Sequence, residues 1–131
     1  MSQSNNLQVL VVDDDAGFRD VLCGFLESRN LIVRQASSGM SALDEINRAT
    51  PDIIFLDVYM PEMNGLQVLK TIREHWPQVK VIVMSGYATE EMAKEAMDLG
   101  ATDFLNKPIE LELLDDMLPL FKSDVSEYTT N

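Results

Sequence analysis

Five short apolar segments recur along the chain, and each is followed by a longer stretch with helical periodicity. The apolar segments cover residues 7–12, 31–36, 53–56, 79–84 and 103–105. Several are continuously apolar or rich in β-branched residues, which is typical of strands that are covered on both faces. Alternating strands and helices with short connections require right-handed crossovers and a parallel sheet. The pattern therefore predicts an α/β fold, (βα)5, with a doubly wound five-stranded parallel sheet.

The stretches between the apolar segments supply apolar faces for helices. In the first of them, one predicted buried face has the i, i+3, i+4, i+7, i+8 spacing and consists of Phe18, Val21, Leu22, Phe25 and Leu26. Cys23 lies among these residues, so we expect a small buried side chain rather than a reactive thiol. As the single cysteine it excludes an internal disulfide, which suits a reducing compartment.

The length of 131 residues suits one domain. We expect residues 1–6 to be a disordered N-terminal end, 7–122 to be the folded domain, and 123–131 to be a polar C-terminal tail or the start of a linker. Pro119 falls within the last helical stretch and removes a backbone donor. That helix is therefore expected to kink or to end early.

Acidic residues dominate the charge of the chain, with 22 Asp and Glu against 10 Lys and Arg, for a formal net charge of −12. This balance argues against direct binding of nucleic acid or of an anionic membrane by this domain. No apolar run approaches the ~20 residues that a membrane helix needs, and the polar start MSQSNN is not a signal peptide. These features lead us to expect a cytoplasmic protein.

Acidic side chains follow two of the predicted strands directly. Asp13 and Asp14 end the first strand, and Asp57 ends the third. In flavodoxin-like sheets the strand order is 2-1-3-4-5, so the first and third strands are neighbours at the edge where ligands bind. Three neighbouring carboxylates repel one another and raise the pKa of at least one of them unless a cation intervenes. The sequence therefore predicts a site for a hard divalent ion, Mg²⁺ with Mn²⁺ as the alternative.

The ends of the fourth and fifth strands add a hydroxyl and a cation. Ser85 ends the fourth strand, and Lys107 follows the fifth. Taken alone, Ser85 is more simply read as the start of a turn, and Lys107 as a solvated lysine. Together with a carboxylate nucleophile and a metal pocket, however, these groups make up a phosphoryl-acceptor site. Asp15, next to the acidic pair, is predicted to cap a helix rather than to bind metal.

These residues and their spacing closely resemble the receiver domain of two-component response regulators, of the CheY-like chemotaxis-regulator type. The matching stretches are VVDD (11–14), LDVYMPEMNG (56–65), MSG (84–86) and GATDFLNKP (100–108). The resemblance covers about residues 7–121 and gives residues 7–122 as the receiver domain. It implies that Asp57 is the phosphoacceptor and that Asp13 and Asp14 form the acidic pocket. It also implies that Asp14, Asp57 and the Tyr59 backbone carbonyl hold the metal directly.

The same resemblance implies roles for the remaining motif residues. Ser85 takes the position of the family's switch hydroxyl, and Lys107 that of its invariant lysine, with a cis bond to Pro108. Phe104 takes the aromatic switch position, where many members carry tyrosine. Tyr59 and Tyr87 stand two residues after Asp57 and Ser85 and are predicted to shield an aspartyl phosphate from water.

The resemblance also implies partners for phosphorelay signal transduction. The phosphoryl donor would be a sensor histidine kinase or a histidine phosphotransfer protein. The output would be a changed surface on the fourth helix, fifth strand and fifth helix, read by a partner or an attached effector domain. A phosphorylation-dependent homodimer is compatible with that surface. Such a domain catalyses only its own phosphorylation and dephosphorylation, so it is not a turnover enzyme.

Three other classes of protein share parts of this pattern. Haloacid-dehalogenase-type phosphatases need a second acid two residues after the nucleophile, where this chain has Tyr59. A flavin carrier needs a Ser/Thr/Gly-rich phosphate loop, whereas the acids at 13–15 would repel a phosphate. A silent pseudo-receiver normally lacks Asp57, Ser85 or Lys107, and this chain has all three. The sequence argues against the first two classes and leaves the third open.

Overall fold

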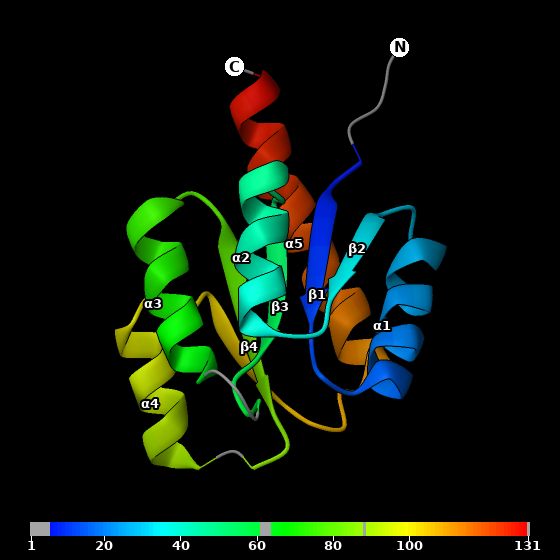
Figure 1. Ribbon diagram of the computed structural model, residues 1–131. Coiled ribbons are helices and arrows are strands. Elements are labelled where there is room, and N and C mark those ends of the chain that lie inside the picture. The colour runs from blue at the N-terminus through cyan, green and yellow to red at the C-terminus, as the bar shows by residue number, and fades with distance from the viewer. Residues whose placement is uncertain (1–5, 61–63, 88, 131) are drawn as a thin grey trace.

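The computed structural model describes residues 6–60, 64–87 and 89–130, with side chains described up to Phe121. Strands and helices alternate throughout (Figure 1). In chain order the elements are β1 (Gln8–Val12), α1 (Ala16–Ser28), β2 (Ile32–Ala36), α2 (Gly39–Arg48), β3 (Ile53–Asp57), α3 (Gly65–His75), β4 (Lys80–Ser85), α4 (Glu90–Asp98), β5 (Asp103–Asn106) and α5 (Leu111–Thr130). The five strands agree with the predicted segments to within a residue or two.

The five strands form one parallel sheet in the order β2-β1-β3-β4-β5, as predicted. In the register of β1 against β3, Val12 pairs with Leu56. The residue after Val12 and the residue after Leu56 are both aspartates. Asp13 and Asp57 therefore lie at the same level, where β1 and β3 end. The parallel register therefore places the acids of both segments at one edge.

Helices cover both faces of the sheet, and each face has its own hydrophobic cluster. Residues of α2, α3 and α4 pack on one face, and residues of α1 and α5 pack on the other (Figure 1). All five residues of β3 are buried, because this central strand is covered on both sides. The strand that is buried along its whole length is thus also the one that ends in a carboxylate.

Side-chain caps fix where the helices next to that edge begin. Asp15 is the N-cap of α1, and its side chain accepts from the Phe18 N–H at 3.1 Å, as predicted. Asn64 caps α3 by accepting from the Leu66 N–H at 2.8 Å. The Gly65 N–H donates to the Val58 carbonyl at 3.1 Å, which ties the start of α3 to the residue after Asp57.

The predicted buried face of α1 is wrong at one position. Val21 is 64% exposed, whereas Leu22, Cys23 and Leu26 are buried against the sheet. The centre of the buried stripe lies between Leu22 and Leu26, so the adjacent Cys23 turns inward and Val21 turns out. The prediction for Cys23 is confirmed, and burial raises the pKa of its thiol to about 11.

The last helix does not end early at Pro119, which was one of the two outcomes expected there. α5 continues through Pro119 to Thr130, and the division into a folded domain (7–122) and a polar tail (123–131) stays a prediction. Pro119 is exposed, so the carbonyl one turn earlier that loses its N–H partner can bind water, and the helix does not end there. Residues 1–5 and 131 of the predicted ends lie outside the described residues. Within the described part of the chain, no helix has both the length and the apolar character to cross a membrane.

Candidate functional site

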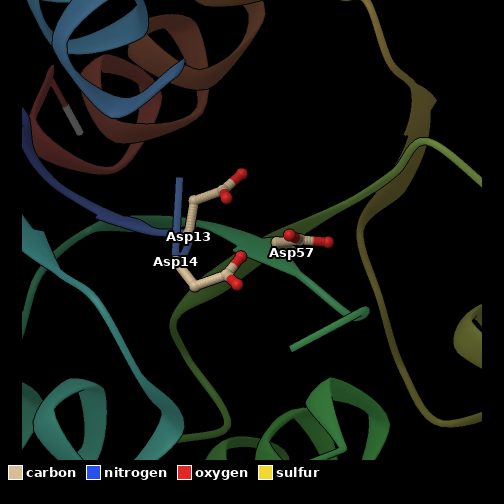
Figure 2. Close-up of side chains that lie close together, drawn as sticks. All are labelled: Asp13, Asp14 and Asp57. Carbon is tan, nitrogen blue, oxygen red and sulfur yellow. The ribbon is translucent and has the colours of Figure 1, made fainter. Parts of the chain in front are cut away.

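Three carboxylates meet at the edge of the sheet where β1 and β3 end. Asp13, Asp14 and Asp57 each offer an oxygen, and these oxygens lie within 4.8 Å of one another (Figure 2). Asp13 and Asp57 are buried, whereas Asp14 is exposed and opens the cluster to solvent. The structure thus brings together the three acids that the sequence placed at one sheet edge.

Lys107 is the cation that reaches this cluster from the segment after β5. Its Nζ lies 2.5 Å from Asp13 Oδ2 and 3.3 Å from Asp57 Oδ2, with the side chain 19% exposed. Lys107 thus contacts both buried acids, and the shorter contact is to Asp13. The ammonium therefore bridges two buried acids from different strands. The peptide bond to Pro108 is cis, as the resemblance implied.

The environment of Asp57 shifts its proton affinity upward. Burial raises the pKa of Asp57 to about 6, and the charge of Asp13 adds to this effect. The Tyr59 N–H, which donates to Asp57 Oδ1 at 3.0 Å, and the Lys107 ammonium both oppose the rise. A raised pKa was predicted from like-charge repulsion, but loss of water around the carboxylate is the larger cause.

The same pocket also raises the pKa of Lys107, and for this group the rise favours the charged form. Burial alone would lower the pKa of Lys107, but its hydrogen bond with Asp13 and the charges of Asp57 and Asp13 outweigh that cost and raise it. The ammonium therefore stays charged at neutral pH. One cation compensates part of the charge of three carboxylates, which leaves the cluster suited to a further cation.

The backbone at Asp13 is held by a residue that the sequence analysis did not select. Arg19 Nη1 donates to the Asp13 carbonyl at 2.6 Å, and Arg19 Nε donates to Gln35 Oε1 at 2.9 Å. The Asp15 N–H donates to Asp13 Oδ1 at 3.0 Å. The sequence does contain a signal for this role: an arginine follows three consecutive aspartates by one helical turn, which places a cation next to the acidic loop.

Ser85 and Phe104 lie on the same face of the sheet. Ser85 is fully buried at the end of β4, and its Oγ accepts from the Tyr87 N–H at 3.0 Å. In the register of β4 against β5, Val83 pairs with Phe104 and Ser85 pairs with Asn106. Because side chains alternate along a strand, Ser85 shares its face with Val83 and hence with Phe104. Phe104 is partly buried against the cluster that α4 also covers.

Two exposed tyrosines stand beside the acidic edge. Tyr59 and Tyr87 are 59% and 67% exposed, and their ring centroids lie 4.7 Å apart with the planes tilted by 40°. They follow Asp57 and Ser85 by two residues, so the ring pair joins the loops after β3 and β4. Because both rings are exposed, packing in the hydrophobic core does not explain why they lie in contact at this position.

Comparison with known proteins identifies the arrangement. A family model described as the response regulator receiver domain matches residues 9–119. The chain is 32% identical over 111 residues to sporulation initiation phosphotransferase F of Bacillus subtilis (strain 168), a match that covers 85% of this chain and 90% of that protein. It is 36% identical over 110 residues to the transcriptional regulatory protein ZraR of Escherichia coli (strain K12), covering 84% of this chain. The chain spans only 25% of the length of ZraR.

Solved structures show the same relationship. The receiver domain of NtrX from Brucella abortus superposes with a TM-score of 0.82 at 32% identity, covering 88% of this chain and 98% of that one. A CheY-like receiver domain protein from Methanospirillum hungatei JF-1 superposes with a TM-score of 0.87 at 25% identity, covering 94% and 99%. With sequence, topology and the acidic edge all in agreement, the chain belongs to the response regulator receiver domain family.

Proposed function

We propose that Asp57 is the residue of this receiver domain that takes the phosphoryl group in the phosphorelay. The supporting observation is the position of its carboxylate, buried at the end of the central strand between two further acids and Lys107. The family is one of signalling domains and not of turnover enzymes. In the proposed reaction the domain promotes only its own phosphorylation and the later loss of that group.

The Asp57 carboxylate would act as the nucleophile. Its raised pKa of about 6 still lies below neutral pH, so the carboxylate is mainly in the ionised form that attacks. An Asp57 oxygen forms the new bond to phosphorus while the bond from phosphorus to the donor's imidazole nitrogen breaks, and the imidazole leaves with that electron pair and takes up a proton. The Tyr59 N–H holds Oδ1, which leaves Oδ2 on the side of Lys107.

Two groups of the pocket would stabilise charge on the transferred group. The Lys107 ammonium already lies between Asp13 and Asp57 and can turn to a phosphoryl oxygen without crossing the site. The three acids offer oxygens within 4.8 Å of one another, and together with the Tyr59 carbonyl they would make an all-oxygen donor set that fits Mg²⁺, with Mn²⁺ as the alternative ion. Bound there, the ion would neutralise charge on the phosphoryl oxygens.

Phosphorylation of purified protein tests the proposal. Wild type incubated with acetyl phosphate and Mg²⁺ should gain one phosphoryl group by intact mass, and Asp57→Asn should gain none. Asp15→Asn is the matched control, because Asp15 caps α1 and asparagine caps equally well. It should be labelled like wild type. Undiminished labelling of Asp57→Asn would refute the assignment, and an unlabelled wild type would favour a pseudo-receiver.

Ser85 is proposed to pass the signal to Phe104 and to the surface of α4 and β5 around it. Ser85→Ala should still accept phosphate, because Asp57 and Lys107 are intact, but it loses the hydroxyl that can turn to the phosphoryl group. Beryllofluoride should therefore shift the backbone resonances of α4 and β5 in wild type and much less in Ser85→Ala. An identical shift pattern in both proteins would show that the hydroxyl is not the relay.

Tyr59 and Tyr87 are proposed to slow attack of water on the aspartyl phosphate. Tyr59→Ala removes one ring of the contacting pair but keeps the backbone N–H that donates to Asp57. The rate of phosphate loss should therefore rise while the Mg²⁺ dissociation constant changes little. Phosphate release after removal of the donor measures the rate. Unchanged rates in both Tyr59→Ala and Tyr87→Ala would remove the shielding role.

The donor proposed for this chain is a phosphohistidine of a sensor histidine kinase or of a phosphotransfer protein, in the cytoplasm. The recipient proposed is a partner or an attached effector domain that reads the surface of α4, β5 and α5. Met97, Leu111 and Leu113 supply exposed apolar area to that surface, which also suits a phosphorylation-dependent homodimer. Native mass spectrometry with and without beryllofluoride distinguishes monomer from dimer.

A further inference from the structure

The ammonium of Lys107 has a third neighbour besides Asp13 and Asp57. Its Nζ lies 4.3 Å from the centroid of the Phe18 ring. Phe18 belongs to the first turn of α1, and its ring is partly buried against the cluster between α1, α5 and the sheet. We propose that Phe18 is a positioning residue, which holds Lys107 in place for phosphoryl transfer. This inference rests on the proposed function of Asp57.

A lysine needs such support more than the acids do. Its ammonium sits at the end of a flexible four-carbon stem and is strongly hydrated, so solvent competes for it. The face of an aromatic ring attracts a cation through the ring quadrupole, and the attraction is larger where the cation has lost water. Lys107 meets that condition, because its side chain is 19% exposed. Two carboxylates and a ring therefore contact the cation.

The ring itself is fixed by the way α1 begins. Asp15 caps the helix through the Phe18 N–H, and the ring then packs into the core cluster. A leucine at this position would fill much of the same space but offers no quadrupole to the ammonium. Without the ring, Lys107 can swing toward solvent, and fewer molecules have it ready beside Asp57 when the phosphodonor arrives.

Three variants separate positioning from packing. Phe18→Leu removes the ring, and Phe18→Tyr keeps it. Phe25→Leu is the matched control: Phe25 lies on the same helix, packs against the same cluster and has a cation over its ring, Arg29 at 4.5 Å from the centroid. That cation pairs with Asp115, outside the acidic edge. The control therefore loses comparable packing and a comparable cation contact without touching Lys107.

The first measurement needs neither metal nor phosphate. Protons on the last methylene of Lys107, next to an aromatic ring face, should resonate upfield in EDTA through the ring current. The upfield shift should persist in Phe18→Tyr and Phe25→Leu and vanish in Phe18→Leu. Absence of the shift in wild type would overturn the inference, because the ring would then not contact the ammonium in solution.

The second measurement is the initial rate of phosphorylation by acetyl phosphate at saturating Mg²⁺. Phe18→Leu should be about fivefold slower than wild type, which corresponds to about 1 kcal/mol of lost cation–π interaction. Phe18→Tyr and Phe25→Leu should stay within about twofold of wild type, because both keep the contact to Lys107.

If Phe18→Leu is as fast as Phe25→Leu, or Phe18→Tyr is as slow as Phe18→Leu, the positioning role is overturned while the proposed function stands. An unlabelled wild type overturns both.

Discussion

Asp57→Asn should make the metal-free protein more stable, by about 1–3 kcal/mol near neutral pH. The wild type holds a buried carboxylate whose pKa is raised to about 6. Ionising this group therefore costs more free energy in the folded protein than in the unfolded chain. Asparagine removes this charge and can still accept the Tyr59 N–H. Lys107 keeps its shorter contact to Asp13 in the variant. A residue kept for chemistry at a cost in stability is the usual trade at functional sites.

The stability difference between wild type and Asp57→Asn should depend on pH. The folded pKa is about 6 and the usual value is 3.8, so between these values the folded protein binds more protons at Asp57 than the unfolded chain does. Wild-type stability should therefore fall as the pH rises from about 4 to about 6 and should change little from this source above that. Asp57→Asn should lack this fall, so the free energies of unfolding of the two proteins should become similar near a pH of about 4.

Urea unfolding in EDTA across this range measures the difference. Saturating Mg²⁺ should then stabilise wild type more than the variant, since the intact acids bind it best. A variant that unfolds more easily than wild type in EDTA at neutral pH would contradict the prediction and assign Asp57 a structural role.

Gly65→Ala should destabilise the protein by about 1–3 kcal/mol or more. A Cβ at this position would lie 2.2 Å from the Val58 Cα and 2.7 Å from the Asp57 carbonyl oxygen. Both atoms belong to the backbone, so no side-chain rotation relieves the overlap, and the end of β3 must shift. Because that end carries Asp57, phosphorylation should slow together with the loss of stability.

Gly24→Ala is the control for this substitution. A Cβ at Gly24 would meet nothing within 4 Å, and the residue lies inside α1. Alanine there should stabilise the helix by roughly 0.5–1 kcal/mol, the cost that glycine carries in helix interiors. Thermal and urea unfolding of both variants should thus move in opposite directions. Equal stability of wild type and Gly65→Ala would show that the loop yields without cost.

The fold and the acidic edge could be predicted because both depend on simple order along the chain. Alternating apolar and amphipathic stretches determine a parallel sheet, and such a sheet brings all strand ends to the same edge, so Asp13, Asp57 and Ser85 could be placed from position alone. Which acid Lys107 prefers could not be predicted, because it depends on differences of less than an ångström between flexible side chains.

Other features were missed because they depend on packing around a residue rather than on its type. Val21 fits the apolar period of α1 but lies at the margin of the buried stripe. The pKa of Asp57 rises mainly through burial, which a charge count along the sequence does not contain. α5 can continue past Pro119 because this residue is exposed, and the presence of a proline in the sequence does not by itself show whether it is exposed.

The bridge from Lys107 to Asp13 and Asp57 has a consequence for which ions can compete at this site. A covalently attached monovalent cation already contacts two of these acids, so a free monovalent ion has to displace it to bind there. Potassium or sodium would only replace a charge that is already there, whereas a divalent ion adds charge beyond it. If the pocket binds Mg²⁺ as proposed, the tethered ammonium should make it discriminate by valence. The melting temperature should then respond to Mg²⁺ but not to potassium chloride at equal ionic strength.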